Sequence, residues 1–314
     1  MNRYPFCLFR IPENGGRVLW EITNTCNYHC SYCIFSSESK KYEHELTTDE
    51  VKRAIKELKE NNFTYIKFTG GEPFTRKDMT EILKYANEFG FDMDISTNAS
   101  LITDGIAKEL KNINFPMIHV SLDGNDKTSH EYVRGENTFE RTLKGIRYLT
   151  NNQIYTRIGT VIYKQNEDKL EEIVKLGIEL KANEIIFSFM EAVGRLDGDE
   201  TIISKRTIDG VKEELEKLAT KYKEQIQVKY SFTENKTTET KECCPAVNKF
   251  LYINNLGQVS PCTWVVSNNP EYKSKLTLKN STFAEIIKSE PIQRYLEYIE
   301  ENQIKGCPVC RRNQ

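Results

Sequence analysis

Residues 17–33 read RVLWEITNTCNYHCSYC and join two unlike patterns in one short stretch. Residues 17–23 are rich in Val, Ile, Trp and Thr, a composition typical of a buried β-strand. Three cysteines follow in the spacing C-x3-C-x2-C, at Cys26, Cys30 and Cys33. We therefore expect a strand whose carboxyl end leads directly into a loop that carries three thiols.

Strand and helix patterns alternate after this stretch. Further β-rich runs are predicted at residues 63–69, 91–97, 116–122, 155–163 and 184–189. Apolar residues at helical spacing lie between these runs, at residues 48–61, 77–90, 138–151 and 168–180, and Thr47 with Glu50 forms a capping-box pattern. The alternation predicts an α/β fold of parallel strands joined by right-handed crossovers, namely a partial (βα)6 TIM barrel. In such a fold the loops after the strands' carboxyl ends carry the chemistry.

The pattern changes after Arg195. A polar connection at residues 196–207 precedes a charged helix at 209–223 and a polar linker at 233–242. A β-hairpin is predicted from residues 249–262, with its turn at Asn255-Leu256-Gly257, and helices are predicted at 283–289 and 292–300. We therefore expect four parts: an N-terminal extension (1–16), the barrel (17–195), a helix and linker (196–242), and a small C-terminal β-hairpin and helix domain (243–314).

Composition excludes several classes of function. The net charge of −2 over 314 residues gives no general basic field for nucleic acid. No apolar run approaches the ~20 residues that span a bilayer, and residues 1–16 lack a signal-peptide core. These features predict a cytoplasmic protein that binds neither nucleic acid nor membrane. In such a chain, cysteines are more often metal ligands or catalytic groups than disulfides, although Cys7 is expected to be an ordinary buried thiol.

The first cysteine group suits an iron–sulfur cubane with one open iron. Three thiolates on one loop can bind three irons and leave the fourth without a protein ligand. The alternative is a zinc or ferredoxin-type site, but zinc would need a fourth local ligand and His29 is poorly spaced for that role. Residues 70–73 read Gly-Gly-Glu-Pro directly after the second predicted strand. The glycines allow a backbone to approach a ligand closely, and Glu72 can accept hydrogen bonds from a cationic amine.

The spacing C-x3-C-x2-C with Tyr32 before the last cysteine, together with Gly70-Gly71-Glu72-Pro73, resembles the signature of the radical S-adenosylmethionine (SAM) superfamily. This resemblance covers residues 20–195. It implies a 4Fe–4S cluster whose open iron binds SAM, and an electron donor such as flavodoxin or ferredoxin. One electron then cleaves SAM to a 5′-deoxyadenosyl radical that abstracts a hydrogen atom from the substrate. The resemblance further implies SAM contacts from Tyr32 (adenine), Gly70, Gly71, Glu72 and Pro73 (amino group), and Ser96, Asn98, Ser121 and Arg134 (ribose and carboxylate).

A second group of cysteines lies near the C-terminus. Cys244 and Cys262 flank the predicted hairpin, and Cys307 and Cys310 form a C-x2-C pair suited to one metal. Zinc and an iron–sulfur cluster both remain open on these ligands. The arrangement resembles the Twitch version of the SPASM domain, which implies one auxiliary 4Fe–4S cluster. The hairpin spacing favours Cys244 over Cys243 as ligand, and leaves Cys243 as a hydrogen-atom donor, an inert extra cysteine or an alternative ligand.

The resemblance leaves several substrates open. Twitch and SPASM relatives modify ribosomally made peptides by cross-linking, oxidation or epimerisation, and others dehydrogenate or epimerise aminocyclitols and sugars. We favour a peptide, although many peptide modifiers carry an N-terminal leader-binding domain and only about 16 residues precede the first strand here. An enzyme that activates a glycyl radical is less favoured. A non-catalytic metal-binding interaction module is the alternative from another class, but it would not need the Gly-Gly-Glu-Pro segment.

Overall fold

The computed structural model describes residues 15–40, 43–113, 117–232, 247, 249–263 and 270–301. Within these residues, nine strands form one sheet in the order β7-β6-β5-β4-β3-β2-β1-β8-β9. Neighbouring strands are parallel except for the antiparallel β8–β9 hairpin. The strands are β1 (Gly16–Thr23), β2 (Phe63–Gly70), β3 (Asp92–Thr97), β4 (Met117–Ser121), β5 (Thr156–Ile162), β6 (Glu184–Phe189), β7 (Gln227–Tyr230), β8 (Phe250–Ile253) and β9 (Val259–Ser260).

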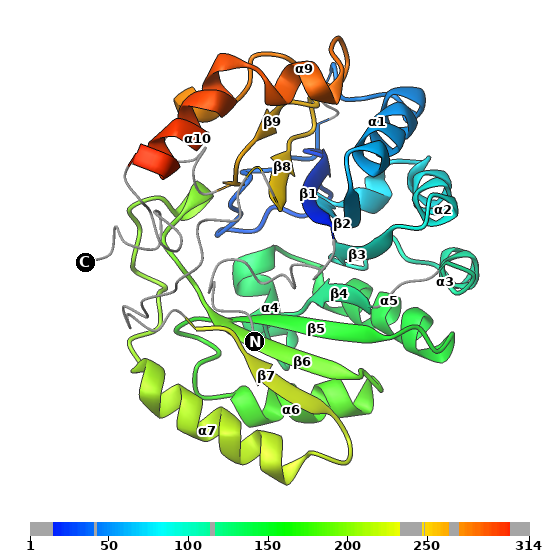
Figure 1. The fold of residues 1–314 in the computed structure, drawn as a ribbon. Helices are drawn as coiled ribbons and strands as arrows, with labels where there is room; N and C mark the ends of the chain where they lie inside the picture. The colour runs from blue at the N-terminus through cyan, green and yellow to red at the C-terminus, as the bar shows by residue number, and fades with distance from the viewer. Residues whose placement is uncertain are drawn as a thin grey trace.

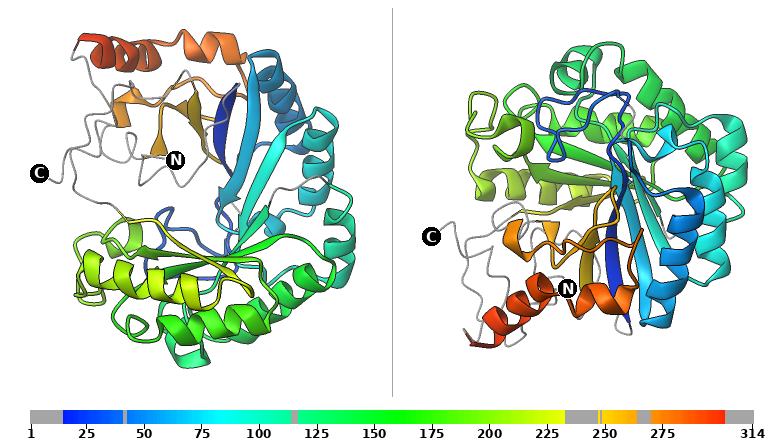
Figure 2. Two further views of the ribbon diagram at one scale, coloured as in Figure 1. Left: turned by 60° about the horizontal axis from the view of Figure 1, so that its bottom comes forward. Right: turned by 90° about the horizontal axis from the view of Figure 1, so that it is seen from above.

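The sheet is strongly curved, and its crossover helices lie along the convex side (Figures 1 and 2). Of the described helices, none is both long and apolar enough to cross a membrane. They are α1 (Thr48–Glu60), α2 (Met79–Glu88), α3 (Asp104–Leu110), α4 (Lys127–Arg134), α5 (Phe139–Asn151), α6 (Leu170–Glu179), α7 (Ile208–Lys221), α9 (Phe283–Ile287) and α10 (Glu290–Glu301). The described residues also include the short 3-10 turns η1 (Pro73–Thr75), η2 (Gly194–Leu196) and η3 (Pro270–Tyr272).

The predicted partial barrel is confirmed. The six predicted strands correspond to β1–β6, and the predicted helices correspond to α1, α2, α5, α6, α7, α9 and α10 with boundaries shifted by a few residues. The capping box at the start of α1 is also present, since the Thr47 hydroxyl accepts from the Glu50 amide and the Glu50 carboxylate accepts from the Thr47 amide. The hairpin predicted at residues 249–262 is β8–β9.

The sheet extends further than the sequence predicts. β7 pairs with β6, so the sheet continues past the boundary expected at residue 195. β8 pairs in parallel with β1, with Arg17 opposite Phe250 and Trp20 opposite Ile253. The hairpin expected in a separate C-terminal unit is therefore joined through β8 to the strand that carries the cysteine loop.

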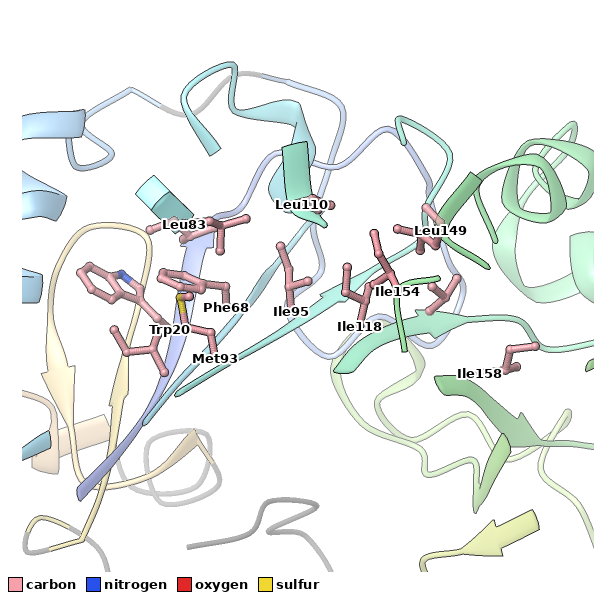
Figure 3. Close-up of a cluster of buried hydrophobic side chains, with 14 of the residues drawn as sticks. Trp20, Phe68, Leu83, Met93, Ile95, Leu110, Ile118, Leu149, Ile154 and Ile158 are labelled. Carbon is pink, nitrogen blue, oxygen red and sulfur yellow. The ribbon is translucent and has the colours of Figure 1, made fainter. Parts of the chain in front are cut away.

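The main core lies between the sheet and its helices. Side chains alternate along a strand, so every second residue of β1 faces the helices. Trp20 is fully buried there and stacks on Phe68 of β2, with 6.1 Å between the ring centroids. Figure 3 shows these rings beside Met93, with the same layer continuing through Ile95 and Ile118 towards β5.

The opposite face of the sheet carries several buried charged residues. Arg17 of β1 is 1% exposed; its guanidinium lies 3.9 Å from the Asp94 carboxylate of β3 and 4.0 Å from the centre of the Tyr65 ring. Glu184 of β6 pairs with Arg157 at 2.5 Å and with Lys229 at 2.7 Å. The concave side therefore holds buried ion pairs next to a smaller apolar cluster that includes Leu19, Phe250 and Tyr252.

Candidate active site

The loop after β1 brings the three cysteines of the first group to one cavity. Cys26, Cys30 and Cys33 all contribute to its lining. The Cys26 amide donates to the Glu38 carbonyl at 2.8 Å, and the Ser31 amide donates to the Val133 carbonyl at 2.8 Å. Burial raises the pKa of the Cys26 thiol to about 12, and the neighbouring Glu72, Cys30 and Cys33 add to this effect while the Tyr28 amide opposes it. Burial therefore favours the protonated form of the Cys26 thiol, which must lose its proton to bind a metal.

Gly70 and Gly71 lie against the backbone of the cysteine loop. A Cβ built on Gly70 would lie 2.1 Å from the Thr23 carbonyl oxygen, and one on Gly71 would lie 2.3 Å from the Thr25 carbonyl oxygen. Gly70 also has a φ of +135°, which favours glycine. The Gly71 amide donates to Thr23 at 2.8 Å and the Glu72 amide donates to Thr25 at 2.9 Å. The glycines are therefore required by close contact between the loops after β1 and β2, and both also line the cavity.

Glu72 and Pro73 are placed differently from the other predicted SAM contacts, because neither lines the cavity. Glu72 is fully buried, and its carboxylate accepts from the Thr97 hydroxyl (2.7 Å), the Asn98 amide (2.7 Å) and the Phe74 amide (3.1 Å). Burial raises its pKa to about 7, with these hydrogen bonds acting in the opposite direction. In this structure Glu72 ties the end of β2 to the end of β3 and does not offer a free carboxylate to a ligand.

The ends of β3 and β4 supply polar groups to the same cavity. Ser96, Asn98 and Ser121 all line it, as predicted from their positions at the strands' carboxyl ends. The Asn98 amide nitrogen Nδ2 donates to Asn27 Oδ1 at 3.0 Å, and its Oδ1 accepts from the Ser100 amide at 2.9 Å. Asn98 therefore joins the end of β3 to the cysteine loop.

Tyr32, Asp123 and Arg134 form a buried network beside Cys30. Arg134 Nε donates to Asp123 Oδ2 at 2.6 Å, and Arg134 Nη2 donates to the Tyr32 hydroxyl, which donates to Asp123 Oδ2 at 2.5 Å. Arg134 Nη1 lies 3.8 Å from Cys30 Sγ. Burial raises the pKa of the Cys30 thiol, and the Arg134 guanidinium is the largest influence that opposes it. Arginine side chains usually lie on the solvated surface, but Arg134 is only 7% exposed.

Sequence reasoning missed three residues around the loop. Gly194 of η2 packs on it, since a Cβ there would lie 2.4 Å from the Cys33 carbonyl oxygen. The Arg195 guanidinium donates to the carbonyls of Cys30 and, at 2.6 Å, Ser37. Asp123 accepts from the Val161 amide at 2.9 Å as well as from Arg134. Asp123 follows β4, and Gly194 and Arg195 follow β6. Their positions after the carboxyl ends of barrel strands could have identified them as candidate site residues.

The cavity has a volume of about 600 Å³, within the ~300–1,000 Å³ usual for small-molecule sites. Its far half comes from the ends of β5, β6 and β7 and from residues 203–208. Apolar side chains dominate there, with three serines (Ser188, Ser204 and Ser231) among them. Two charged groups also lie in this half. The Arg206 guanidinium is bound to Glu214 at 2.6 Å and to the Glu167 carbonyl at 2.6 Å. Burial raises the pKa of the Glu191 carboxyl to about 7.

The three thiols of the cysteine loop fit an iron–sulfur cubane. In the part of the chain that the structure describes, no three His, Cys, Asp or Glu side chains are arranged to hold one ion. Zinc would need all its thiolates about 2.3 Å from a single point. In a cubane each thiolate binds its own iron, so three thiols that line one cavity suit that group.

The structure describes only Cys262 of the second cysteine group. Cys262 is buried at the end of the β8–β9 hairpin, in an apolar cluster with Leu19, Tyr252 and Tyr295. Cys243, Cys244, Cys307 and Cys310 lie outside the described residues, as does Cys7.

The chain is similar to several known proteins. An AdoMet-dependent heme synthase of Methanosarcina barkeri is 35% identical over 60% of this chain and 54% of its own length. A PqqA peptide cyclase of Bradyrhizobium diazoefficiens is 26% identical over 78% of this chain and 66% of its own length. The crystal structure of Streptococcus suis SuiB bound to its precursor peptide SuiA superposes with a TM-score of 0.74, at 17% identity, over 96% of this chain and 77% of SuiB. The chain spans about half the length of the heme synthases that it matches.

The family model for the radical SAM superfamily matches residues 20–177. The match begins within β1 and includes the cysteine loop, the Gly-Gly-Glu-Pro segment, and Arg134. The chain therefore belongs to the radical SAM superfamily.

Proposed function

We propose that this chain binds a 4Fe–4S cluster on Cys26, Cys30 and Cys33, binds SAM in the adjoining cavity, and modifies a C–H position of a ribosomally made peptide. Membership of the family implies one such cluster and SAM. When bound, these groups supply the electron and the 5′-deoxyadenosyl radical. The protein's contribution is to position them and to exclude water.

One observation carries the proposal. Three thiols, the Gly70-Gly71 backbone and the polar ends of β3 and β4 reach a single cavity at the carboxyl end of the barrel. We assign Gly70 and Gly71 to the amino end of SAM through their backbone, and Ser96, Asn98, Ser121 and Arg134 to its ribose and carboxylate. Tyr32 contributes its ring to the lining and its hydroxyl to the Asp123–Arg134 network. Glu72 supports these contacts through its hydrogen bonds to Thr97 and Asn98 at the end of β3.

A peptide substrate is supported by the relatives and by the far half of the cavity. The PqqA peptide cyclase is similar over 78% of this chain, and a mycofactocin maturase is 33% identical over 51% of it. Apolar side chains and serine hydroxyls, which dominate the β6 and β7 end of the cavity, suit side chains and backbone of a peptide.

Haem synthesis is the second candidate, because heme synthases are the more identical relatives. Fe-coproporphyrin III carries several carboxylates and would need cations to bind them. Among the described residues of the far half, the Arg206 guanidinium is already paired with Glu214, and Glu191 adds a carboxylate of its own. This charge balance favours the peptide.

We also propose an auxiliary 4Fe–4S cluster of the Twitch or SPASM type on Cys244, Cys262, Cys307 and Cys310. Four thiolates would saturate it, so it would accept an electron from a substrate radical and would not bind SAM. If the reaction is oxidative, Cys262→Ala should still yield 5′-deoxyadenosine but little product. If it is an epimerisation, Cys243→Ala should block hydrogen return, and solvent deuterium should enter the product of the unmodified enzyme.

The first test is anaerobic reconstitution with iron and sulfide, followed by reduction in the presence of SAM. We expect about eight irons per chain and formation of 5′-deoxyadenosine. Replacing Cys26, Cys30 and Cys33 with Ala should abolish 5′-deoxyadenosine and leave about four irons. Persistent SAM cleavage in that variant would refute the assignment, and about four irons plus one zinc in the unmodified protein would remove the auxiliary cluster.

The second test separates the substrates. Precursor peptides encoded beside the gene and Fe-coproporphyrin III are offered to the same preparation. A mass change in a peptide supports the proposal, whereas decarboxylation of the porphyrin supports haem synthesis.

A further inference from the structure

The Arg134 guanidinium is shared between the cavity and one cluster ligand. Its Nη1 lies 3.8 Å from Cys30 Sγ, within hydrogen-bonding distance for sulfur. The residue lies at the end of α4, and it also lines the cavity. Arginine has five N–H donors in a fixed plane, so contacts on one side of the fork determine where the others point.

Two buried partners fix that plane. Asp123 is fully buried and accepts from Nε at 2.6 Å, and the Tyr32 hydroxyl accepts from Nη2. Asp123 is itself held by the Val161 amide of β5 at 2.9 Å. The guanidinium cannot turn away from Cys30 without breaking these bonds, so the contact with sulfur is built in and does not depend on SAM.

From this geometry we propose that Arg134 is a positioning residue for Cys30 and that its N–H···S contact raises the reduction potential of the first cluster. The inference rests on the proposed function, because it assumes that Cys30 binds that cluster. Reduction adds one negative charge to the cluster. A positive charge and a hydrogen bond at a ligating sulfur stabilise the reduced form and so raise the potential.

Arg195 provides a matched control on the same loop. Its guanidinium also holds Cys30, but through the carbonyl oxygen, and its second contact is the Ser37 carbonyl at 2.6 Å. Replacing Arg195 should loosen the loop without removing a donor to sulfur. The two arginines therefore separate an effect on the sulfur from an effect on loop stability.

The experiment is a redox titration of the first cluster, followed by its EPR signal, without SAM or substrate. All variants are made in a Cys262→Ala background. This background removes a proposed ligand of the auxiliary cluster and leaves the ligands of the first cluster intact. We expect Arg134→Gln to raise the ratio of oxidised to reduced cluster about tenfold at a fixed potential. This corresponds to a fall of about 59 mV in the one-electron reduction potential. Arg134→Lys should lower the reduction potential by less than Arg134→Gln. Arg195→Gln should shift the potential by at most about a third of the Arg134→Gln shift, and it should lower the melting temperature.

An unchanged potential in Arg134→Gln, or an equal shift in Arg195→Gln, would overturn the inference. If neither Arg134 variant retains its cluster, the unmodified protein decides the question. Protein labelled with ¹⁵N-arginine should show a ¹⁵N coupling to the reduced cluster by pulsed EPR, and its absence would overturn the inference. The proposed function fails separately, if the protein binds no cluster on this loop or forms no 5′-deoxyadenosine.

Discussion

The tight contact at Gly71 makes Gly71→Ala the sharpest test of the site geometry. The added Cβ would lie 2.3 Å from the Thr25 carbonyl oxygen, 0.7 Å short of the 3.0 Å that real Cβ contacts respect, and 3.0 Å from Cys26 Cβ. That oxygen also accepts the Glu72 amide, so the loops cannot separate without weakening this hydrogen bond.

The cost follows from these contacts. Overpacking of a rigid site costs ~1–3 kcal/mol, and a weakened hydrogen bond costs about 1 kcal/mol more. The cysteine loop would move by an amount approaching 1 Å, and misplacement of that size lowers activity about 100-fold. We therefore expect Gly71→Ala to lose about 2–4 kcal/mol of stability and at least about 99% of 5′-deoxyadenosine formation.

The assay measures 5′-deoxyadenosine by chromatography, iron by chelation and unfolding by urea titration. Gly105→Ala is the control, because its Cβ would have only the Thr103 hydroxyl nearby, at 3.8 Å, and it lies within α3. That substitution should be neutral or stabilise the helix by ~0.5–1 kcal/mol. Wild-type iron content and a rate within twofold of wild type in Gly71→Ala would refute the steric reasoning.

Three further substitutions test other parts of the molecule. Trp20→Ala removes a fully buried ring and should cost ~3–5 kcal/mol in urea unfolding; a loss under about 1 kcal/mol would contradict the packing described. Glu72→Gln turns an amide NH₂ towards one of three donors, so it should lower the free energy of unfolding by about 1–3 kcal/mol and lower the melting temperature. An unchanged melting temperature would argue against the role of Glu72 in joining the ends of β2 and β3. Burial raises the pKa of Glu21 to about 7, opposed by the Tyr252 hydroxyl, so the native state holds this proton more tightly than the unfolded state between about pH 4.5 and 7. The stabilisation that this proton provides is full below about pH 4.5 and is lost as the pH rises through 7. Relative to wild type, the free energy of unfolding of Glu21→Gln should therefore increase by about 3 kcal/mol from pH 4.5 to pH 8. Parallel pH profiles of the two proteins would refute this.

Local patterns were enough to predict most of the barrel. β1–β6 are apolar runs between helices with clear spacing. Ser96, Asn98 and Ser121 lie at or next to the carboxyl ends of β3 and β4 and line the cavity. β7 was missed because it is only four residues long, QVKY, and alternates between exposed and half-buried positions. Short strands of this kind carry little periodic signal.

What the sequence could not predict is set by contacts between distant segments. The parallel pairing of β8 with β1 depends on chain closure, which no local pattern records. The same is true of the side chains: Glu72 was expected to face a ligand, but it is occupied by Thr97, Asn98 and Phe74. Arg134 was expected to meet a carboxylate of SAM, and the structure shows that Asp123 and Tyr32 already hold it in place.

The pairing of β1 with β8 also has a consequence during synthesis. Phe250, which pairs with Arg17 of β1, is synthesised 250 − 17 = 233 residues after it. At ~5–20 residues per second, one edge of β1 remains unpaired for on the order of ten to fifty seconds. An open strand edge can pair with other chains during that interval. The strand that leads into the cysteine loop therefore acquires its second neighbour long after it has been synthesised.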